Sequence, residues 1–246
     1  MKRISKILYT ALACLGCAGP AAAIPVANSI TEFSAVQGQD SWSYGFFNLT
    51  AKGGAYTGAD FTAFDTVGGS GAAAIWRASA AQVGADNNVF LGINVNGGHP
   101  NGIGPGAQDS NIWAIRRYTS EVSGLVRIDF DLHKENISNP RGGGITGHLF
   151  VDGLEVFSSL IDNLDGIGIQ DSVFATVNVG SLIDFAIDPL GPGAPPGGDG
   201  VASARADGTH FSAVIRVGEI PEPGNALLTG LGLVALFATR RTTYRR

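Results

Sequence analysis

Four histidines and 21 acidic residues are the side chains best suited to bind metals or move protons in this 246-residue chain. No histidine has a partner at the spacing of a metal-binding helix, so a zinc-protease signature is absent. The segment Gly68-Gly69-Ser70-Gly71-Ala72 lacks the last glycine of a nucleophile elbow. We therefore predict no catalytic residue and no metal site. The histidines are His99, His133, His148 and His210.

Aspartates near the predicted loops supply the oxygen ligands that Ca²⁺ prefers. The segment Asp162-Asn163-Leu164-Asp165-Gly166 misses the EF-hand pattern, because Ile161 stands where the first aspartate belongs. Aspartate is also a common turn residue. The prediction is therefore no cofactor, with calcium kept as the alternative. The aspartates concerned are Asp162, Asp165, Asp171, Asp184, Asp188, Asp199 and Asp207.

Aromatic side chains carry the other candidate chemistry. Trp42, Tyr44 and Trp113 could stack on the apolar face of a sugar ring, and Arg116 could donate hydrogen bonds to its hydroxyls. These four residues are the predicted glycan-binding site. The aromatic residues also recur at a period of two, as they do on the core face of a strand, so core packing is the alternative.

The elements that must position these side chains are short strands. Residues 126–133 alternate strictly between apolar and polar, which places Arg127, Asp129, Asp131 and His133 on one face. Residues 148–157 predict a hairpin with Asp152-Gly153 as a type I′ turn. No helical period is visible in the body, so we predict an all-β fold, an antiparallel sandwich or barrel. The further predicted strands are residues 30–36, 41–49, 61–67, 73–78, 89–95, 112–119, 173–179, 182–187 and 211–217.

Several short segments of the body resemble jelly-roll ectodomains of secreted bacterial proteins, which are similar in outline to carbohydrate-binding modules. The resemblance implies a secreted antiparallel β-sandwich of the jelly-roll type. The segments are Gln37–Gly45, His99-Pro100, Ala114–Ser120, Val151–Gly153 and Asp184–Pro189. Three loops of the body are long and glycine-rich, residues 97–109, 136–144 and 189–207, and long loops at one end of a sandwich commonly carry binding sites.

The N-terminus has the three parts of a secretory signal peptide. Basic residues Lys2, Arg3 and Lys6 precede an apolar run over residues 7–19, and Ala21-Ala22-Ala23 follows. We expect cleavage after Ala23. Both cysteines, Cys14 and Cys17, lie within this segment, so the mature protein is expected to contain no thiol and no disulfide.

The C-terminus has three parts as well. Pro221-Glu222-Pro223 precedes an apolar segment over residues 225–239, predicted to be a short membrane helix, and Arg240-Arg241 begins a basic end. This tail resembles the PEP-CTERM sorting signal of Gram-negative bacteria. The resemblance implies transient anchoring in the inner membrane, removal by an exosortase, and release to the cell surface or matrix. The tail also occurs on some ice-binding proteins, but no Thr-x-Thr array is present here.

Charge excludes nucleic acid as a partner. Residues 24–219 hold 9 Lys and Arg against 20 Asp and Glu, and such an acidic body repels phosphate backbones. The expected organisation is a signal peptide (1–23), a β-sandwich (24–218) and a sorting signal (219–246). The predicted function is a non-catalytic binding or structural role at the cell surface, in contact with exopolysaccharide. A secreted glycan-active hydrolase is the alternative, since a carboxylate pair is defined by its separation in space.

Overall fold

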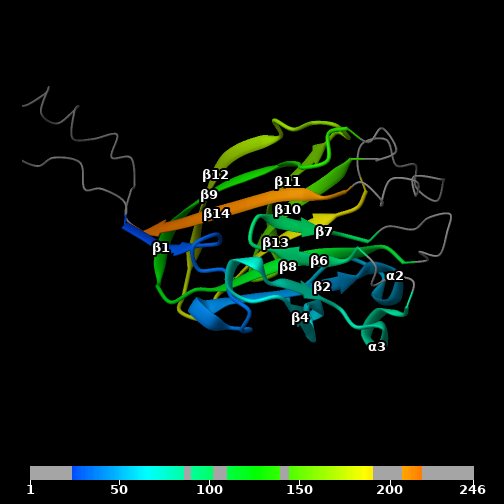
Figure 1. Cartoon of the computed structure of the whole chain (residues 1–246). Coiled ribbons are helices and arrows are strands. Elements are labelled where there is room, and N and C mark those ends of the chain that lie inside the picture. The colour runs from blue at the N-terminus through cyan, green and yellow to red at the C-terminus, as the bar shows by residue number, and fades with distance from the viewer. Residues whose placement is uncertain (1–23, 86–89, 102–109, 139–143, 191–206, 218–246) are drawn as a thin grey trace, which may run out of the picture. The chain divides into compact units, whose positions relative to one another are not determined.

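Two antiparallel β-sheets pack face to face in the described part of the chain (Figure 1). The structure is a computed structural model that describes residues 24–85, 90–101, 110–138, 144–190 and 207–217. These residues belong to one compact unit that runs from Ile24 to Val217. The predicted all-β antiparallel sandwich is confirmed. The predicted signal peptide with Ala23, and the predicted sorting tail with Pro221, Glu222, Pro223, Arg240 and Arg241, lie outside the described residues.

The larger sheet has the strand order β12-β9-β14-β7-β6-β5-β4, and β1 pairs with β14. Its strands are β1 (Ile24–Asn28), β4 (Thr66–Gly68), β5 (Ile75–Arg77), β6 (Gly92–Asn94), β7 (Gly97–His99), β9 (Gly124–Lys134), β12 (Ile169–Val177) and β14 (Thr209–Val217). The smaller sheet has the order β11-β10-β13-β8-β2-β3. Its strands are β2 (Trp42–Asn48), β3 (Thr62–Ala63), β8 (Ile112–Thr119), β10 (Ile145–Val151), β11 (Leu154–Ile161) and β13 (Leu182–Asp188).

Helices are short and lie between the strands. They are α2 (Leu49–Lys52), α3 (Ala80–Val83) and three 3₁₀ turns at Gln39–Ser41, Gly58–Asp60 and Gly71–Ala73. Asn48 begins α2 by accepting a hydrogen bond from the Ala51 N–H, and Gly53 ends it at a φ of 65°. In the described ranges, no helix has the length and apolar character needed to cross a membrane.

The main core lies between the two sheets. It takes the inward side chain of every second residue, as strand geometry requires. Trp42 and Tyr44 of β2 meet Ile128 of β9 and Ile215 of β14 there, all at most 1% exposed. Since burial of each large apolar side chain contributes about 1.5–3 kcal/mol, this layer supplies most of the driving force for folding.

A second, smaller core covers the outer face of the smaller sheet. It comprises Phe47, Tyr56, Trp113, Ile115, Phe150 and Ala186. Arg117 donates through Nε and Nη2 to the two Asp184 oxygens at 2.6 and 2.8 Å, and the Tyr56 hydroxyl donates to Asp184 at 2.8 Å. Burial, followed by the nearby Asp184 charge, raises the pKa of Tyr56 above its usual range. The segment after α2 is thereby fixed to the sheet, and the side chains of this second core are covered.

One predicted strand is absent and another is divided between the two sheets. Residues 30–36 form turns, because the Asn28 side-chain oxygen accepts from the Ile30 and Thr31 N–H groups and diverts the chain. Residues 61–67 are split between the sheets, with β3 in the smaller and β4 in the larger. In contrast, β8 has the predicted bounds, and β9 extends the predicted strand by two residues at its start and one at its end.

The predicted Asp152-Gly153 turn is present between β10 and β11. Its two residues have φ values of 51° and 80°, as a type I′ turn requires. The Asp152 carboxylate also accepts hydrogen bonds from the Leu182 N–H and the Ser181 hydroxyl, both at 2.8 Å. The turn is therefore tied to the start of β13.

Gly153→Val is expected to lower the free energy of unfolding by about 1–3 kcal/mol. A β-branched residue is strained at a φ of 80°, and an added Cβ would lie 3.0 Å from the Gly58 nitrogen. Urea denaturation of the variant and of Gly68→Ala, whose Cβ would meet no atom within 4 Å and whose φ is not positive, measures the difference. A Gly153→Val variant as stable as the wild type would show that this hairpin does not depend on the left-handed conformation.

Candidate functional site

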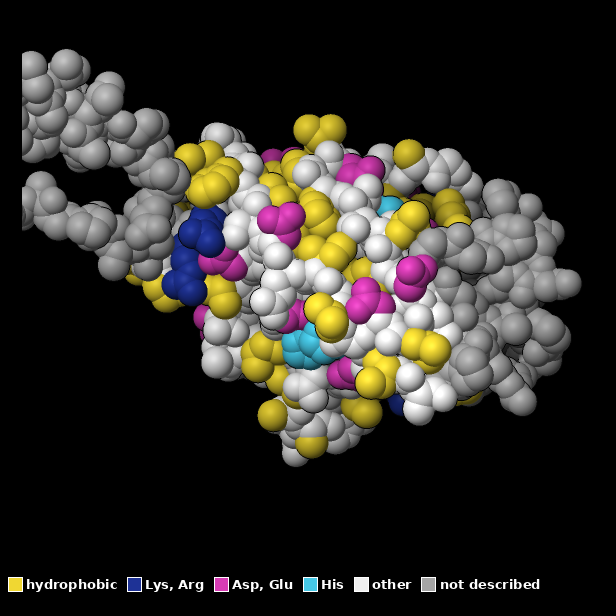
Figure 2. Space-filling view, turned by 90° about the horizontal axis from the view of Figure 1, so that it is seen from above, with side chains coloured by type: hydrophobic (Ala, Val, Ile, Leu, Met, Phe, Trp, Pro, Cys, Tyr) yellow, Lys and Arg dark blue, Asp and Glu magenta, His cyan; other side chains and the backbone are white. Residues whose placement is uncertain are grey.

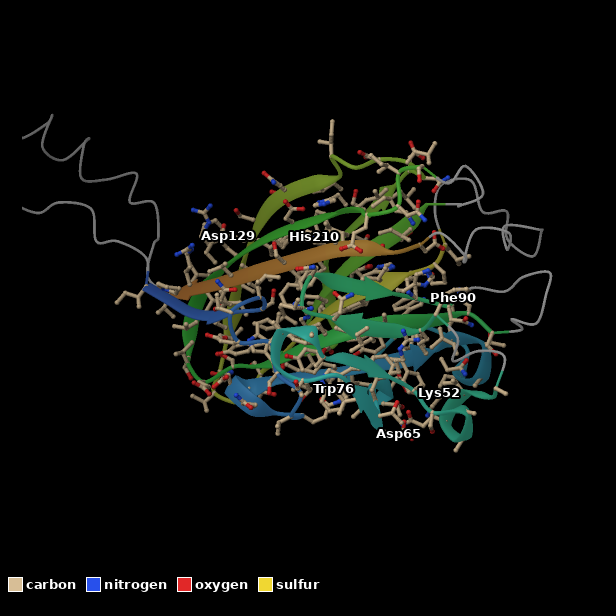
Figure 3. All side chains as sticks on the ribbon, viewed as in Figure 1. Lys52, Asp65, Trp76, Phe90, Asp129 and His210 are labelled. Carbon is tan, nitrogen blue, oxygen red and sulfur yellow. The ribbon has the colours of Figure 1, made fainter. Side chains whose placement is uncertain are left out.

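The outer face of β12, β9 and β14 carries a regular array of polar side chains. Strand register places β9 between the other two, with Asp129 opposite Ser172 of β12 and Val214 of β14. One step along the strands, Asp131 lies between Gln170 and Ser212 in the same way. Directly opposed residues point to the same side of a sheet, so these rows form one surface. Figure 3 labels Asp129 of β9 and His210 of β14, which are neighbouring strands of this sheet.

Asp129 is the centre of a hydrogen-bond network on this face. Its Oδ1 accepts from Arg127 Nε at 2.6 Å and from the Ser172 hydroxyl at 2.7 Å, and its Oδ2 accepts from Arg216 Nε at 3.1 Å. Partial burial raises the pKa of Asp129, but the hydrogen bonds from Ser172, Arg216 and Arg127 outweigh it, and the net shift is downward. This carboxylate is therefore a fixed, ionised acceptor.

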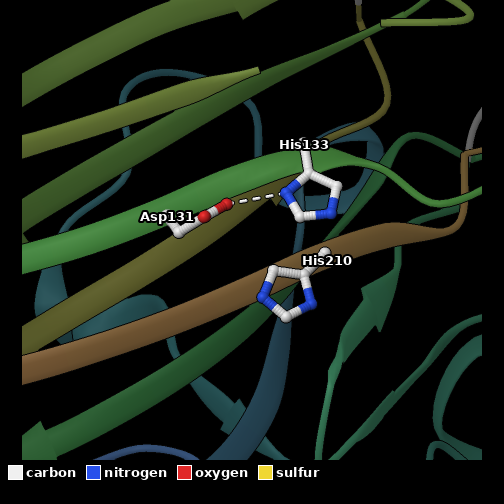
Figure 4. Close-up of side chains that lie close together, drawn as sticks. All are labelled: Asp131, His133 and His210. Atoms are coloured by element: carbon white, nitrogen blue, oxygen red, sulfur yellow. Dashed lines mark hydrogen bonds and ion pairs between the residues drawn. The ribbon is translucent and has the colours of Figure 1, made fainter. Parts of the chain in front are cut away.

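Asp131 organises the next row. Its Oδ1 lies 2.7 Å from His133 Nδ1, which donates to it, and its Oδ2 accepts from Gln170 Nε2 at 2.6 Å. The His133 ring stacks on that of His210, with centroids 4.5 Å apart and 18° between the planes (Figure 4). Burial, and then the neighbouring His133, lower the pKa of His210. In the space-filling view, histidine lies on a face that also bears acidic side chains, with basic ones gathered at one end (Figure 2).

Between these side chains lies an open groove of about 360 Å³. The volume falls within the range of about 300–1,000 Å³ that small-ligand sites occupy. Its lining residues are Asp129, Phe130, Asp131, Gln170, Asp171, Ser172, Ser212, Ala213 and Val214. The groove thus combines carboxylates, an amide and hydroxyls with a few apolar atoms.

The chemistry of the groove is that of hydrogen bonding. A carboxylate offers about four acceptor positions, and Asp131 uses two of them within the protein. A general acid needs a carboxyl group whose pKa is raised. Among the described carboxyl groups, Asp207 has its pKa raised, to about 6, by burial, and it lies outside the groove against Lys134.

The structure buries the four residues predicted to bind glycan. Trp42, Tyr44 and Arg116 lie in the main core at 0%, 0% and 2% exposure, and Trp113 lies in the second core at 8%. Arg116 donates to the backbone carbonyls of Ser29 and Asn94 at 2.9 and 2.6 Å. These side chains therefore form no open platform for a sugar ring. They are packed in the cores, as the alternative interpretation proposed.

The aspartates considered for calcium are spread over several elements. Asp165 and Asp188 accept hydrogen bonds from backbone N–H groups two or three residues further along the chain, as turn residues do. Asp184 pairs with Arg117, and Asp207 pairs with Lys134. Asp199 lies outside the described residues.

Of the three strands that form this site, only the polar face of β9 was predicted from the sequence. The alternation in β9 predicted that Arg127, Asp129, Asp131 and His133 share a face, as they do. Their partners on β12 and β14 were missed, because cross-strand register is set by the fold. The available signal was the alternation in β14, where every second residue from His210 to Arg216 is polar except Val214.

No family model and no curated protein matches this chain. Solved structures similar to it include a CBM51 from Clostridium perfringens GH95 in complex with methyl-galactose (TM-score 0.29, 11% identity, 70% of this chain and 99% of that chain). A second is a β-glucosidase from Kluyveromyces marxianus in complex with glucose (TM-score 0.31, 9% identity, 78% of this chain and 18% of that chain). A third is a CBM35 from Paenibacillus barcinonensis (TM-score 0.24, 10% identity, 49% of this chain and 88% of that chain). The fold and the site described above rest on this chain's own residues.

Proposed function

We propose that the protein is an exported, non-catalytic glycan-binding protein of the cell surface or matrix, and that the groove over β12, β9 and β14 is its saccharide site. The observation that carries the proposal is the fixed set of hydrogen-bonding groups around Asp129 and Asp131. Each of these carboxylates is held by at least two neighbouring side chains, so little conformational entropy is lost when a ligand binds.

Sugar recognition requires both polar and apolar contacts. Ring hydroxyls pair with carboxylate, amide and hydroxyl groups, all of which line the groove. Val214 faces the same groove, and Phe174 lies one row beyond Ser172 with 46% exposure. These apolar surfaces suit the C–H face of a pyranose ring.

The groove favours binding over the alternative of a hydrolase. Glycoside hydrolysis pairs a protonated carboxyl group with an ionised one. Asp129 is held ionised by three donors, and Asp131 accepts from His133 and Gln170. The groove therefore supplies acceptors, while no described feature equips one of its carboxyl groups as the acid.

The two ends of the chain support export. The basic and apolar start with Ala23 is typical of a secreted protein, and the Pro221-Glu222-Pro223 tail resembles an exosortase signal. We propose that an exosortase and the export machinery are its processing partners, and that exopolysaccharide is the source of its glycan ligand. A glycan array that includes the exopolysaccharide of the exporting bacterium tests the ligand class. Retention of one glycan family is expected, and an array without any retained glycan would contradict the proposal.

A further inference from the structure

Asp131, His133 and His210 are brought together by the register of β9 and β14. His133 and His210 are directly opposed across the two strands, and Asp131 lies two residues before His133 on the same face. One nitrogen or oxygen atom from each residue can be chosen so that all three lie within 4.8 Å of one another. All three side chains are partly exposed, so an ion can reach them from solvent. The arrangement is the strand counterpart of two histidines one turn apart on a helix.

We propose that Asp131, His133 and His210 form a binding site for a transition-metal dication such as Zn²⁺. Two imidazoles and one carboxylate are the ligand types that zinc, nickel and copper select, whereas calcium and magnesium take oxygen ligands. Zinc–nitrogen and zinc–oxygen bonds of about 2.0–2.2 Å place ligand atoms about 3.3 Å apart in a tetrahedron. Rotation of the two imidazoles about their side-chain bonds closes the remaining distance.

The surroundings of the three residues suit a metal ion. Gln170 Nε2 holds Asp131 Oδ2 at 2.6 Å and thereby orients the carboxylate, as outer hydrogen bonds do at metal sites. His133 Nδ1 donates to Asp131 Oδ1 at 2.7 Å, and a metal ion that bound both atoms would replace this hydrogen bond and leave the imidazole proton on Nε2. With three protein ligands, a fourth position stays open for water or for a ligand group.

The metal site adjoins the glycan groove but does not depend on it. Asp131 lines the groove, whereas His133 and His210 are not among the residues that line it. An ion at this place would add a positive charge at one end of a surface that carries Asp129 and Asp131. The site can therefore hold metal whether or not the groove binds a saccharide.

Calorimetric titration of the full-length chain with ZnCl₂ tests this proposal. The chain is purified in mild detergent with an affinity tag that contains no histidine. One Zn²⁺ per chain is expected, and His210→Gln is expected to weaken its affinity about 10-fold or more, by the loss of one ligand. The matched control is His148→Gln, because His148 also contacts carboxylates, Glu155 Oε1 at 2.6 Å and Asp188 Oδ2 at 3.7 Å, but on the other sheet.

Visible absorption of the Co²⁺ complex gives a second measurement. Bound Co²⁺ in a tetrahedral site with nitrogen ligands is expected to give an intense band in the wild type and in His148→Gln, but not in His210→Gln. Far-ultraviolet circular dichroism of each variant without metal verifies that it is folded. Absence of Zn²⁺ binding by the folded wild type would overturn the proposal, and so would binding that survives His210→Gln and is lost in His148→Gln.

Discussion

Alanine at positions 221, 222 and 223 is expected to keep the protein in the inner membrane, uncut and absent from the medium. Proline has a fixed φ and no backbone N–H, so we expect Pro221 and Pro223 to keep the apolar segment from continuing the last strand. The apolar segment over residues 225–239, about 15 residues long, is short for a permanent span, which needs about 20 residues. If the tail is an exosortase signal, as we propose, so short a segment needs to hold the protein only until cleavage.

Fractionation of the exporting bacterium, followed by detection with an antibody to the sandwich, measures this effect. The matched control is the pair Gly224→Ala and Asn225→Ala, which alters the two residues that follow the tripeptide. The control is expected to reach the medium at the wild-type level. Release of the tripeptide variant at that same level would show that the tail is not read as a sorting signal.

Removal of the Asp207 carboxylate is expected to lower the free energy of unfolding by about 3–5 kcal/mol. Lys134 Nζ donates to Asp207 Oδ1 at 2.7 Å, and both side chains are 0% exposed. Burial lowers the pKa of Lys134 and raises that of Asp207, so each charge is tolerated chiefly because the other is present. Asp207→Ala leaves an ammonium group in the interior without its partner.

Denaturant titration of Asp207→Ala and of the double variant Lys134→Met with Asp207→Leu distinguishes charge from packing. The double variant removes both charges and is expected to be close to the wild type in stability, because paired apolar replacements avoid the desolvation cost. A single variant that loses less than about 1 kcal/mol would show that Lys134 finds solvent or another partner.

The strands that could be predicted from the sequence are those whose own residue pattern is sufficient to indicate a strand. From Val126 to His133, β9 alternates strictly between apolar and polar residues, and β8 begins with four apolar residues. The β10–β11 hairpin has a turn whose residues are suited to positive φ. Each of these signals is local. Residues 30–36 show the opposite case, since their apolar content suggests a strand while the Asn28 side chain caps their backbone as a turn.

The site depended on information that a single strand does not contain. Trp42 and Tyr44 have the composition of a sugar platform, but their alternation equally fits a core face, and packing between the two sheets decided the matter. His133 and His210 are far apart in the sequence, and only the pairing of β9 with β14 makes them neighbours. A search for histidine pairs at helical spacing does not detect histidines that are brought together by neighbouring strands.

We propose above that the groove over β12, β9 and β14 binds a glycan. The most direct test of this proposal compares the affinity of wild type, Asp129→Ala and Asp162→Ala for the glycan retained on the array. Asp162 is an exposed turn residue outside the groove, so its variant is a matched control. Asp129→Ala removes an ionised acceptor and releases Arg127, Ser172 and Arg216, and hydrogen bonds to charged groups contribute about 1.5–3 kcal/mol. We expect binding about 10–100-fold weaker in Asp129→Ala and unchanged in Asp162→Ala, whereas wild-type affinity in Asp129→Ala would contradict the account.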